Sequence, residues 1–312
     1  MPAPDVLISE VGPRDGLQSV KATMPTADKL RWIDALHAAG LREIEVASFV
    51  PARLLPQMAD AAEVVRHAIT LPGLTVMALV PNRRGAEAAL AAGVHKLTMP
   101  VSASAAHSLA NVRKTREEMV EEVRAIAALR REMAPQVRLE AGISTAFGCT
   151  LQGQVDKREV LRLMQALLDA GADRVSMADT VGYADPGMVR DLFEDALRVA
   201  GDRFWCGHFH DTRGLGLANV YAALEVGVNR FDACLAGIGG CPHAPGASGN
   251  VSTEDLAYML GSMRIKTGID IDRLLALRTR VAEWLAGETL HGSLWQAGLP
   301  KTFGLPAQAL SA

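Results

Sequence analysis

The fold class is decided by the stretch His37-Ala-Ala-Gly-Leu-Arg-Glu-Ile-Glu-Val-Ala-Ser48. An alanine-rich helix end is followed by one glycine and then by a short apolar run, the order expected where a helix closes and a strand begins. The same order recurs before three other candidate strands, at Leu90-Ala-Ala-Gly93, Leu168-Asp-Ala-Gly171 and Leu224-Glu-Val-Gly227. Glycine supplies the left-handed backbone that ends a helix. One such case would be commonplace, but the recurrence favours a chain of repeated βα units.

Outward from that stretch, short β-branched runs alternate with longer amphipathic segments. We predict eight strands, at residues 6–11, 42–48, 74–80, 94–101, 137–144, 174–178, 204–210 and 230–235. Helices are predicted at residues 27–39, 57–69, 83–92, 115–131, 157–170, 187–200 and 216–226, with another after Ser252 and a last one at 270–290. Such alternation indicates parallel strands joined by crossover helices.

The count of eight strands without a compositional break favours a closed (β/α)8 TIM barrel over a doubly wound open sheet. The chain contains no low-complexity or Pro/Ser-rich linker, so we expect a single domain over residues 1–312. The barrel is expected at residues 5–262, with its active site at the C-terminal ends of the strands. Residues 263–312 are expected to form a helical tail packed on the barrel.

Charge and hydropathy exclude several classes of function. The 32 Lys and Arg residues against 35 Asp and Glu residues give no basic excess for binding nucleic acid or an anionic membrane surface. No run approaches the roughly 20 apolar residues of a membrane span, and the first residues do not resemble a secretory signal. Four cysteines without a CxxC pair fit a reducing compartment. We therefore expect a cytoplasmic protein without a nucleic-acid or membrane partner.

The most informative polar residues are in Gly207-His-Phe-His-Asp211, at the end of the seventh predicted strand. His208 and His210 are two residues apart, so on a strand both side chains point to the same face. Two converging imidazoles form half of a typical metal site. The alternative is a histidine pair that is hydrogen-bonded inside the barrel, and the spacing favours the metal site.

The first predicted strand leads into Glu10-Val-Gly-Pro-Arg-Asp-Gly-Leu-Gln18, where Arg14 and Asp15 follow a Gly-Pro turn. The pair could be a purely structural ion pair. Asp15 would otherwise supply the hard anionic oxygen that a two-imidazole site lacks for Mg²⁺ or Mn²⁺.

After the eighth predicted strand lies Gly237-Ile-Gly-Gly-Cys-Pro-His-Ala-Pro-Gly-Ala-Ser-Gly-Asn250. Its glycines allow a close backbone approach to a ligand, but a Gly-Lys-Ser/Thr sequence is missing, which excludes a P-loop. Cys241 within it suits a proton donor or nucleophile. The other three cysteines are on or beside strands, where packing is the expected role: Cys149, Cys206 and Cys234.

Other strand ends also carry polar groups: Glu45, Ser102, Ser104, His107 and Asp179. The remaining histidines are interpreted as ordinary surface or packing residues: His37, His67, His95 and His291.

Three motifs together resemble the 3-hydroxy-3-methylglutaryl-CoA lyase family of metal-dependent barrels. They are Val11-Gly-Pro-Arg-Asp-Gly-Leu-Gln18, Gly207-His-Phe-His-Asp-Thr212 and the glycine-rich segment at 237–250 followed by Thr253-Glu-Asp255. The similarity extends from about residue 5 to 270. By position it implies a divalent cation, Mg²⁺ or Mn²⁺, with four protein ligands: Asp15, His208, His210 and Asn250.

The resemblance also implies roles around that cation. Arg14 would bind the thioester oxygen, and the residues implied in catalysis are Arg14, Cys241, Asp179, Glu45 and His208. The residues expected to bind substrate are Arg14, Gln18, Ser144 and His107. The implied partner is an acyl-CoA, and we expect a homo-oligomer, either a dimer or a tetramer.

The implied reaction is the retro-Claisen cleavage of 3-hydroxy-3-methylglutaryl-CoA to acetyl-CoA and acetoacetate, a step of leucine degradation. One alternative is the same cleavage of another 3-hydroxyacyl-CoA, such as citramalyl-CoA to acetyl-CoA and pyruvate. Others are a condensing synthase or aldolase of the same barrel group, or a barrel retained as a binding protein. The sequence departs from the family pattern at Thr150-Leu-Gln152 and at His243, so divergence is expected in acyl recognition.

Overall fold

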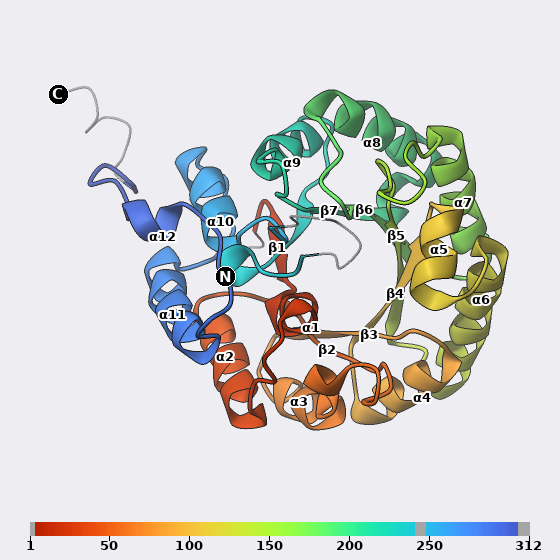
Figure 1. Cartoon of the computed structure of the whole chain (residues 1–312), viewed down its shortest axis with the longest axis horizontal. Coiled ribbons are helices and arrows are strands. Elements are labelled where there is room, and N and C mark those ends of the chain that lie inside the picture. Colours follow the sequence, from red (N-terminus) through yellow and green to blue (C-terminus); the bar gives the residue numbers. More distant parts are fainter. Residues whose placement is uncertain (1–3, 241–247, 305–312) are drawn as a thin grey trace.

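Eight parallel strands close into a barrel in the computed structural model, which describes residues 4–240 and 248–304 (Figure 1). Each strand pairs with the next along the chain, and β1 closes the ring by pairing with β8 from Leu7 opposite Arg230 to Glu10 opposite Ala233. The strands are β1 Leu7–Glu10, β2 Glu43–Ser48, β3 Thr75–Leu79, β4 Lys96–Ser102, β5 Arg138–Ser144, β6 Arg174–Asp179, β7 Phe204–Phe209 and β8 Arg230–Ala233. The predicted TIM barrel is confirmed.

Helices surround this barrel and extend it on one side (Figure 1). They are α1 Leu17–Ser19, α2 Thr26–Ala38, α3 Ala61–Ala68, α4 Arg83–Ala92, α5 Ala105–Val112, α6 Arg116–Met133, α7 Lys157–Asp169, α8 Pro186–Ala200, α9 Gly216–Glu225, α10 Thr253–Ser262, α11 Ile271–Trp284 and α12 Leu294–Ala297. Short helical turns occur at η1 Gly12–Gly16, η2 Pro56–Met58, η3 Gly201–Arg203 and η4 Leu235–Gly237. None of the helices in the described part of the chain is long and apolar enough to cross a membrane.

The glycines that predicted the βα repeat adopt the expected conformation. Gly40, Gly93, Gly171 and Gly227 have φ angles of 103°, 95°, 105° and 98°, in the left-handed region. A side chain there would strain the backbone, whereas glycine adopts it freely. In each of these four βα units a glycine thus ends the helix shortly before the next strand begins, as the repeat indicated.

The structure differs from the predicted elements in several places, and the short helices α1 and α12 are among the elements that were not predicted. The helix predicted at 57–69 begins only at Ala61, because residues 56–58 form a 3-10 turn after Leu55. The last predicted helix, at 270–290, ends at Trp284, and Gly287 beyond it has a φ of 93°. Helix α5 was not predicted. Its first turn is capped by the Ser104 hydroxyl, which accepts from the His107 amide. The polar residues around Ser104 suggested a loop, whereas this serine is the N-cap of a helix.

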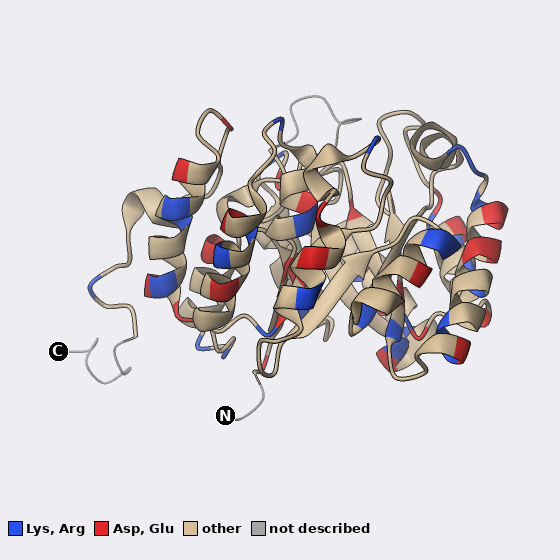
Figure 2. Ribbon diagram, turned by 90° about the horizontal axis from the view of Figure 1, so that it is seen from below, with Lys and Arg blue, Asp and Glu red and all other residues tan. Residues whose placement is uncertain are grey.

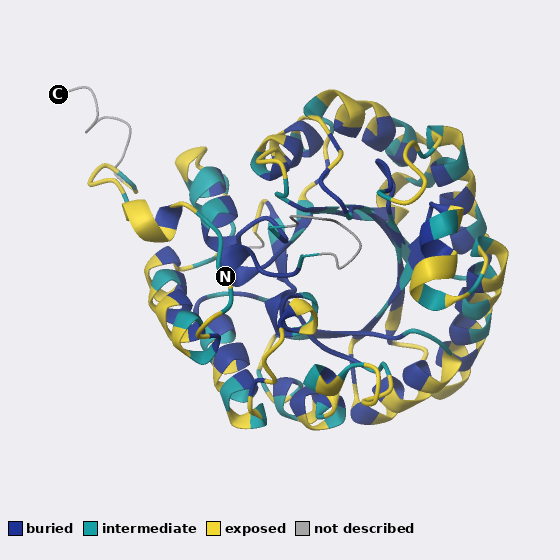
Figure 3. Cartoon of the chain, viewed as in Figure 1, coloured by how far each residue is buried: buried dark blue, intermediate teal, exposed yellow. Residues whose placement is uncertain are grey.

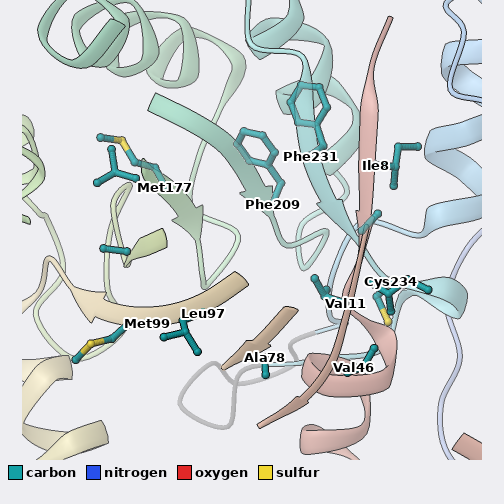
Figure 4. Close-up of a cluster of buried hydrophobic side chains, with 14 of the residues drawn as sticks. Ile8, Val11, Val46, Ala78, Leu97, Met99, Met177, Phe209, Phe231 and Cys234 are labelled. Carbon is teal, nitrogen blue, oxygen red and sulfur yellow. The ribbon is translucent and has the colours of Figure 1, made fainter. Parts of the chain in front are cut away.

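The apolar core lies between the strands and the inner faces of the helices (Figure 3). Ile8, Leu97, Met177 and Phe231 are among its fully or nearly fully buried side chains, and Figure 4 shows them on different strands around the barrel. Each fully buried apolar side chain of this size stabilises the fold by about 1.5–3 kcal/mol. The outer faces of the helices carry interspersed positive and negative residues (Figure 2).

The interior of the barrel itself is polar near its N-terminal end. Lys96 on β4 donates to Glu43 on β2 and to Glu140 on β5, at 3.0 Å each, and Ser9 on β1 donates to Glu43 at 2.5 Å. Strands β2 and β4 are not neighbours, so these side chains meet across the inside of the barrel. A buried lysine held by two carboxylates has its charge compensated in place.

Beyond the barrel strands, α10, α11 and α12 lie beside the β1 and α2 edge (Figure 1). Helix α11 packs against α2 and α10. The loop after α10 returns to the first strand, because the Asp5 and Val6 amides both donate to the Lys266 carbonyl. Farther along the chain, the His291 amide donates to the Ala236 carbonyl at 2.8 Å, which places His291 next to the turn after β8.

Candidate active site and metal centre

Three side chains that could ligate a metal converge at the C-terminal ends of the strands. One ligand atom each from Asp15, His208 and His210 lies within 4.8 Å of the others. The two Nε2 atoms of the histidines are 3.1 Å apart, so both rings are aimed at one point. The same-face prediction for the histidine pair is thereby confirmed in its geometry.

Asn250 completes the group. Its Nδ2 atom donates to Oδ2 of Asp15 at 2.7 Å, and its backbone forms a bridge with His210. The Oδ1 atom of Asn250 and the Nδ1 atom of His210 are buried without a hydrogen-bond partner among the described residues. An amide oxygen, a carboxylate and two imidazoles suit a divalent cation, and a cation would satisfy the buried amide oxygen. The residues present therefore fit such a group.

Glycines allow these segments to approach so closely. A Cβ atom at Gly239, whose φ is 109°, would lie 2.2 Å from Nδ2 of Asn250 and 3.1 Å from Oδ2 of Asp15. One at Gly12 would lie 2.4 Å from Oε1 of Glu10, and one at Gly16 would lie 2.7 Å from the Ile238 side chain. The glycines of both motifs are thus required by contact distance.

Arg14 lies beside Asp15 in η1 and is held by two carboxylates. Its Nε donates to Glu45 at 2.5 Å and its Nη1 donates to Asp15 at 2.6 Å. Glu45, on β2, also accepts from the Thr98 hydroxyl. Burial alone would lower the pKa of Arg14, but Glu45 and Asp15 outweigh it and raise the pKa. The mouth of the barrel therefore contains a fixed cation.

The protonation states of the cluster suit metal binding. Burial raises the pKa of Asp15, but the neighbouring Arg14 and His208 and the hydrogen bond from Asn250 outweigh it, so the pKa is lowered and the group is anionic. Burial and the neighbouring His208 lower the pKa of His210 to about 3, so His210 is neutral. An anionic carboxylate and a neutral imidazole are the forms that ligate metals.

Asp232 on β8 is a site residue that the sequence analysis missed. It lies opposite His208 in the strand register, and its Oδ2 is 3.0 Å from Nδ1 of His208. Burial opposes protonation of His208, but this carboxylate outweighs it and raises the pKa. A carboxylate behind a histidine fixes the ring so that the other nitrogen faces the ligand. The sequence feature that could have identified Asp232 is its position as a single acid within the apolar run Phe231-Asp-Ala-Cys234.

Asp179 is the last residue of β6, and its carboxylate bonds the backbone of the loop that follows. Its carboxylate accepts from the Tyr183 amide at 2.8 Å and the Ala184 amide at 3.0 Å. Burial raises its pKa to about 6, although these amides oppose the shift. Its carbonyl also accepts from the His210 amide at 3.3 Å. The structure thus brings Asp179 next to the histidine pair.

The predicted substrate-binding residues fall into two groups. Ser144 and His107 are linked through Ser102, whose Oγ is 3.0 Å from Oγ of Ser144 and 2.7 Å from Nδ1 of His107. This chain of polar groups lines the ends of β4 and β5. Gln18 is exposed on α1, one turn after Asp15.

Two residues named from the sequence, Cys241 and His243, lie outside the described residues. Cys149, Cys206 and Cys234 are all buried, so the packing prediction for them is confirmed. Gln152, at the departure from the family pattern, accepts from the Ser104 hydroxyl at 2.9 Å. The segment that departs from the family pattern, residues 150–152, therefore contacts the loop that follows β4.

Glu10 lies beneath the metal-ligand cluster and leads to a prediction about stability. Burial raises its pKa to about 7, although Thr253, Leu235 and Gly12 all donate to it. A raised acid pKa means that the folded state binds the proton more tightly, so Glu10 destabilises the fold increasingly as pH rises from about 4.5 to 7. In Glu10→Gln the side-chain amide can donate to the Thr253 hydroxyl and carries no titrating group. We expect the unfolding free energy of this variant, minus that of the wild type, to increase by about 2 kcal/mol from pH 5 to pH 8.

Urea unfolding at both pH values measures this difference. Glu87→Gln, an exposed change on α4, serves as the control and should show no such trend. A difference between Glu10→Gln and wild type that is the same at pH 5 and pH 8 would contradict the prediction.

The fold and the site together define a class of protein: an α/β barrel with a candidate divalent-metal centre at the C-terminal ends of its strands. The HMGL-like family profile matches residues 5–281. The chain belongs to the HMGL-like family, as the three motifs implied.

Relatives and solved structures agree with this assignment. A 3-hydroxy-3-isohexenylglutaryl-CoA/hydroxy-methylglutaryl-CoA lyase of Pseudomonas aeruginosa is 42% identical over 88% of this chain and 91% of its own. A hydroxymethylglutaryl-CoA lyase of Bacillus subtilis is 40% identical over 91% of this chain and 94% of its own. The structure of an HMG-CoA lyase from Acinetobacter baumannii, in complex with coenzyme A and 3-methylmalate, has a TM-score of 0.90 at 37% identity, covering 96% of this chain and 98% of that one.

Proposed function

We propose that this chain is a carbon–carbon lyase that cleaves 3-hydroxy-3-methylglutaryl-CoA to acetyl-CoA and acetoacetate. The observation that carries the proposal is the convergence of Asp15, His208 and His210 beside Arg14 in a member of this family. The names of the P. aeruginosa and B. subtilis relatives support the substrate. The coenzyme A in the A. baumannii structure supports an acyl-CoA ligand.

Four residues would hold Mg²⁺ or Mn²⁺ in this proposal: Asp15, His208, His210 and Asn250. A bound divalent cation supplies Lewis-acid stabilisation and lowers the pKa of a coordinated hydroxyl. Asp232 orients His208 so that its Nε2 faces the centre. Gly239 leaves the space in which Asp15 and Asn250 meet.

The cleavage needs a base, and we assign this role to Asp179. Its pKa of about 6 lets it accept a proton near neutral pH, and each of its oxygens retains a lone pair beyond the one facing a loop amide. Asp179 takes the proton from the 3-hydroxyl of the substrate. The bond between C2 and C3 then breaks, a carbonyl forms at C3, and the electron pair moves to the thioester oxygen as an enolate.

Arg14 stabilises that enolate. The guanidinium is fixed by Glu45 and Asp15 before the substrate arrives, so no reorganisation is needed when the charge develops. Glu45 acts through Arg14 by holding its orientation. Gln18, Ser144 and His107 are proposed to bind the acyl-CoA around this centre.

Cys241 is proposed to donate the proton that C2 of the enolate requires, which completes acetyl-CoA. Solvent returns that proton to the thiolate and removes the one on Asp179, so the cycle balances. Cys241→Ala should lower kcat by about 10²–10³, the lower part of the range for a general acid because water can also protonate the enolate.

The Cys241 prediction is checked by steady-state kinetics together with Mn²⁺ titration. Metal affinity should be unchanged, and Cys149→Ala, at a buried packing thiol, should retain turnover. A Cys241→Ala enzyme with wild-type kcat would remove this residue from the mechanism.

The reaction as a whole is tested by assaying acetyl-CoA release from 3-hydroxy-3-methylglutaryl-CoA. We expect activity with Mg²⁺ or Mn²⁺, loss with EDTA and recovery when the metal is restored. Citramalyl-CoA is the comparison substrate, and its kcat/KM should be at least about a hundredfold lower, the combined effect of a few altered contacts. A ratio of that size in the opposite direction would overturn the substrate, and no cleavage of either thioester would overturn the reaction class.

The same proposal includes a cytoplasmic location, a part in leucine degradation and a homo-oligomeric state, dimer or tetramer. A relative from Rattus norvegicus that is 40% identical over 86% of this chain is named a cytoplasmic lyase. Light scattering coupled to size exclusion measures the oligomer, and a monomeric mass would contradict it.

A further inference from the structure

An alanine at the exit of β8 has a strained backbone. Ala236, within η4, has φ 65° and ψ 14°, which is the left-handed conformation, and it is fully buried. This conformation is costly for any residue with a Cβ atom. Alanine has no polar side chain that could compensate by bonding locally, so the surrounding structure must maintain it.

Both backbone polar groups of Ala236 are held by residues from beyond the barrel strands. Its amide donates to the Glu254 carboxylate, at 3.1 Å to Oε2 and 3.3 Å to Oε1. Its carbonyl accepts from the His291 amide at 2.8 Å. A Cβ atom at the next residue, Gly237, would lie 2.9 Å from Cβ of His291, so the tail packs directly on this turn.

Arg278 of α11 joins the two groups that hold Ala236. Its Nε donates to Oε1 of Glu254 at 2.9 Å, and its Nη2 donates to the His291 carbonyl at 3.0 Å. The side chain of Arg278 is 2% exposed, and its guanidinium carbon lies 4.1 Å from the centre of the Trp295 ring. We call Glu254, Arg278 and the His291 backbone the Arg278 clamp.

The residues that follow Ala236 lie against the candidate metal centre. The Ile238 carbonyl accepts from Nδ2 of Asn250 at 3.0 Å and from the Asn250 amide at 3.4 Å. Gly239 fits into the space beside Asn250 and Asp15. A change of φ at residue 236 would therefore swing residues 238 and 239 away from Asn250.

We propose that the Arg278 clamp is a positioning device for the metal centre: by holding Ala236 left-handed, it places residues 238 and 239 so that Asn250 meets Asp15. This inference rests on the proposed metal site. It gives a role in the site to the segment outside the barrel, including His291, which the sequence marked as ordinary. A clamp that only anchored the tail would stabilise the protein without acting through residue 236.

Glycine at position 236 separates these two roles. It adopts the left-handed conformation without the steric cost, so it should make the clamp dispensable for the metal centre but not for anchoring the tail. The experiment compares Arg278→Lys in the wild-type and Ala236→Gly backgrounds, with Arg280→Lys as the matched control on the same helix. Arg280 is 57% exposed.

Two readouts are measured without substrate: the Kd for Mn²⁺ by calorimetry, and the hydrogen-exchange rate of the Asn250 amide in metal-free protein. Arg278→Lys should raise the Kd and the exchange rate about tenfold, which equals about 1.4 kcal/mol. In the Ala236→Gly background the same change should raise each less than about threefold. Arg280→Lys should change neither.

An equal effect of Arg278→Lys in both backgrounds, or no effect in either, overturns the proposal. If Arg278→Lys does not fold, Gly292→Ala replaces it, because a Cβ there would lie 2.9 Å from Oγ of Ser252 and displace the neighbouring His291. If the wild-type chain does not bind Mn²⁺, the metal assignment under the proposed function fails, and the exchange rates still decide whether the clamp acts through residue 236.

Discussion

Replacing His208 by alanine should lower kcat by about 10³–10⁵ and abolish tight Mn²⁺ binding. The factor follows from the several kcal/mol that Lewis-acid stabilisation contributes to such a transition state. The deletion also leaves the Asp232 carboxylate without its partner at 3.0 Å. Because His208 lies at the mouth and not in the apolar core, the circular dichroism spectrum should remain that of the wild type.

Mn²⁺ titration and steady-state kinetics on the same preparation measure both effects. His67→Ala is the matched control, since His67 is partly exposed and bonds Asp34 on the outside of the barrel. Asp232→Asn should give an intermediate loss, because the ring of His208 remains but its orientation is weakened. Wild-type turnover by His208→Ala in metal-replete buffer would show that the assigned centre is wrong.

Replacing Arg14 by methionine should lower kcat by about 10³–10⁴ while KM changes little. One donor to a developing oxyanion contributes about 10²–10³ in kcat. The rest is expected from the loss of the cation between Glu45 and Asp15, two carboxylates that would then face each other without compensation. Burial raises the pKa of Glu45, and the neighbouring Arg14 opposes that shift. Without Arg14 the pKa should rise further. Glu45 would then take up a proton in the variant.

Arg14→Lys distinguishes charge from geometry. A lysine restores the positive charge but cannot bond Glu45 and Asp15 through a planar fork, so we expect it to recover no more than about tenfold in kcat. Arg53→Met, at an exposed arginine of the β2–α3 loop, is the control. If Arg14→Met raised KM and left kcat unchanged, Arg14 would bind the ground state only and the enolate role would be refuted.

The sequence alone determined the barrel and half of its centre. The strands and most helices follow from local periodicity, and the glycines at 40, 93, 171 and 227 follow from the conformational freedom that a helix end needs. His208 and His210 converge because residues two apart on a strand share a face. These are short-range properties, and the chain carries them within a few consecutive residues.

Asn250 was identified only through the family, because nothing local relates it to Asp15. The two residues are 235 positions apart and meet because β1 and β8 close the ring. Asp232 and its contact to His208 depend on the register between β7 and β8, which no single segment specifies. The start of α5 also depends on a contact between distant segments. The Ser104 hydroxyl accepts from the His107 amide and also donates to Gln152 in another loop, which the sequence around Ser104 does not specify.

The tertiary structure alone decided how the tail meets the site. Ala236 is unremarkable in the sequence, and an alanine does not by itself favour a positive φ. Its conformation exists because Glu254 and His291, brought together by Arg278, hold its amide and its carbonyl. Local sequence sets which elements form, whereas long-range hydrogen bonds made after closure of the barrel set the backbone of the residues beside the metal centre.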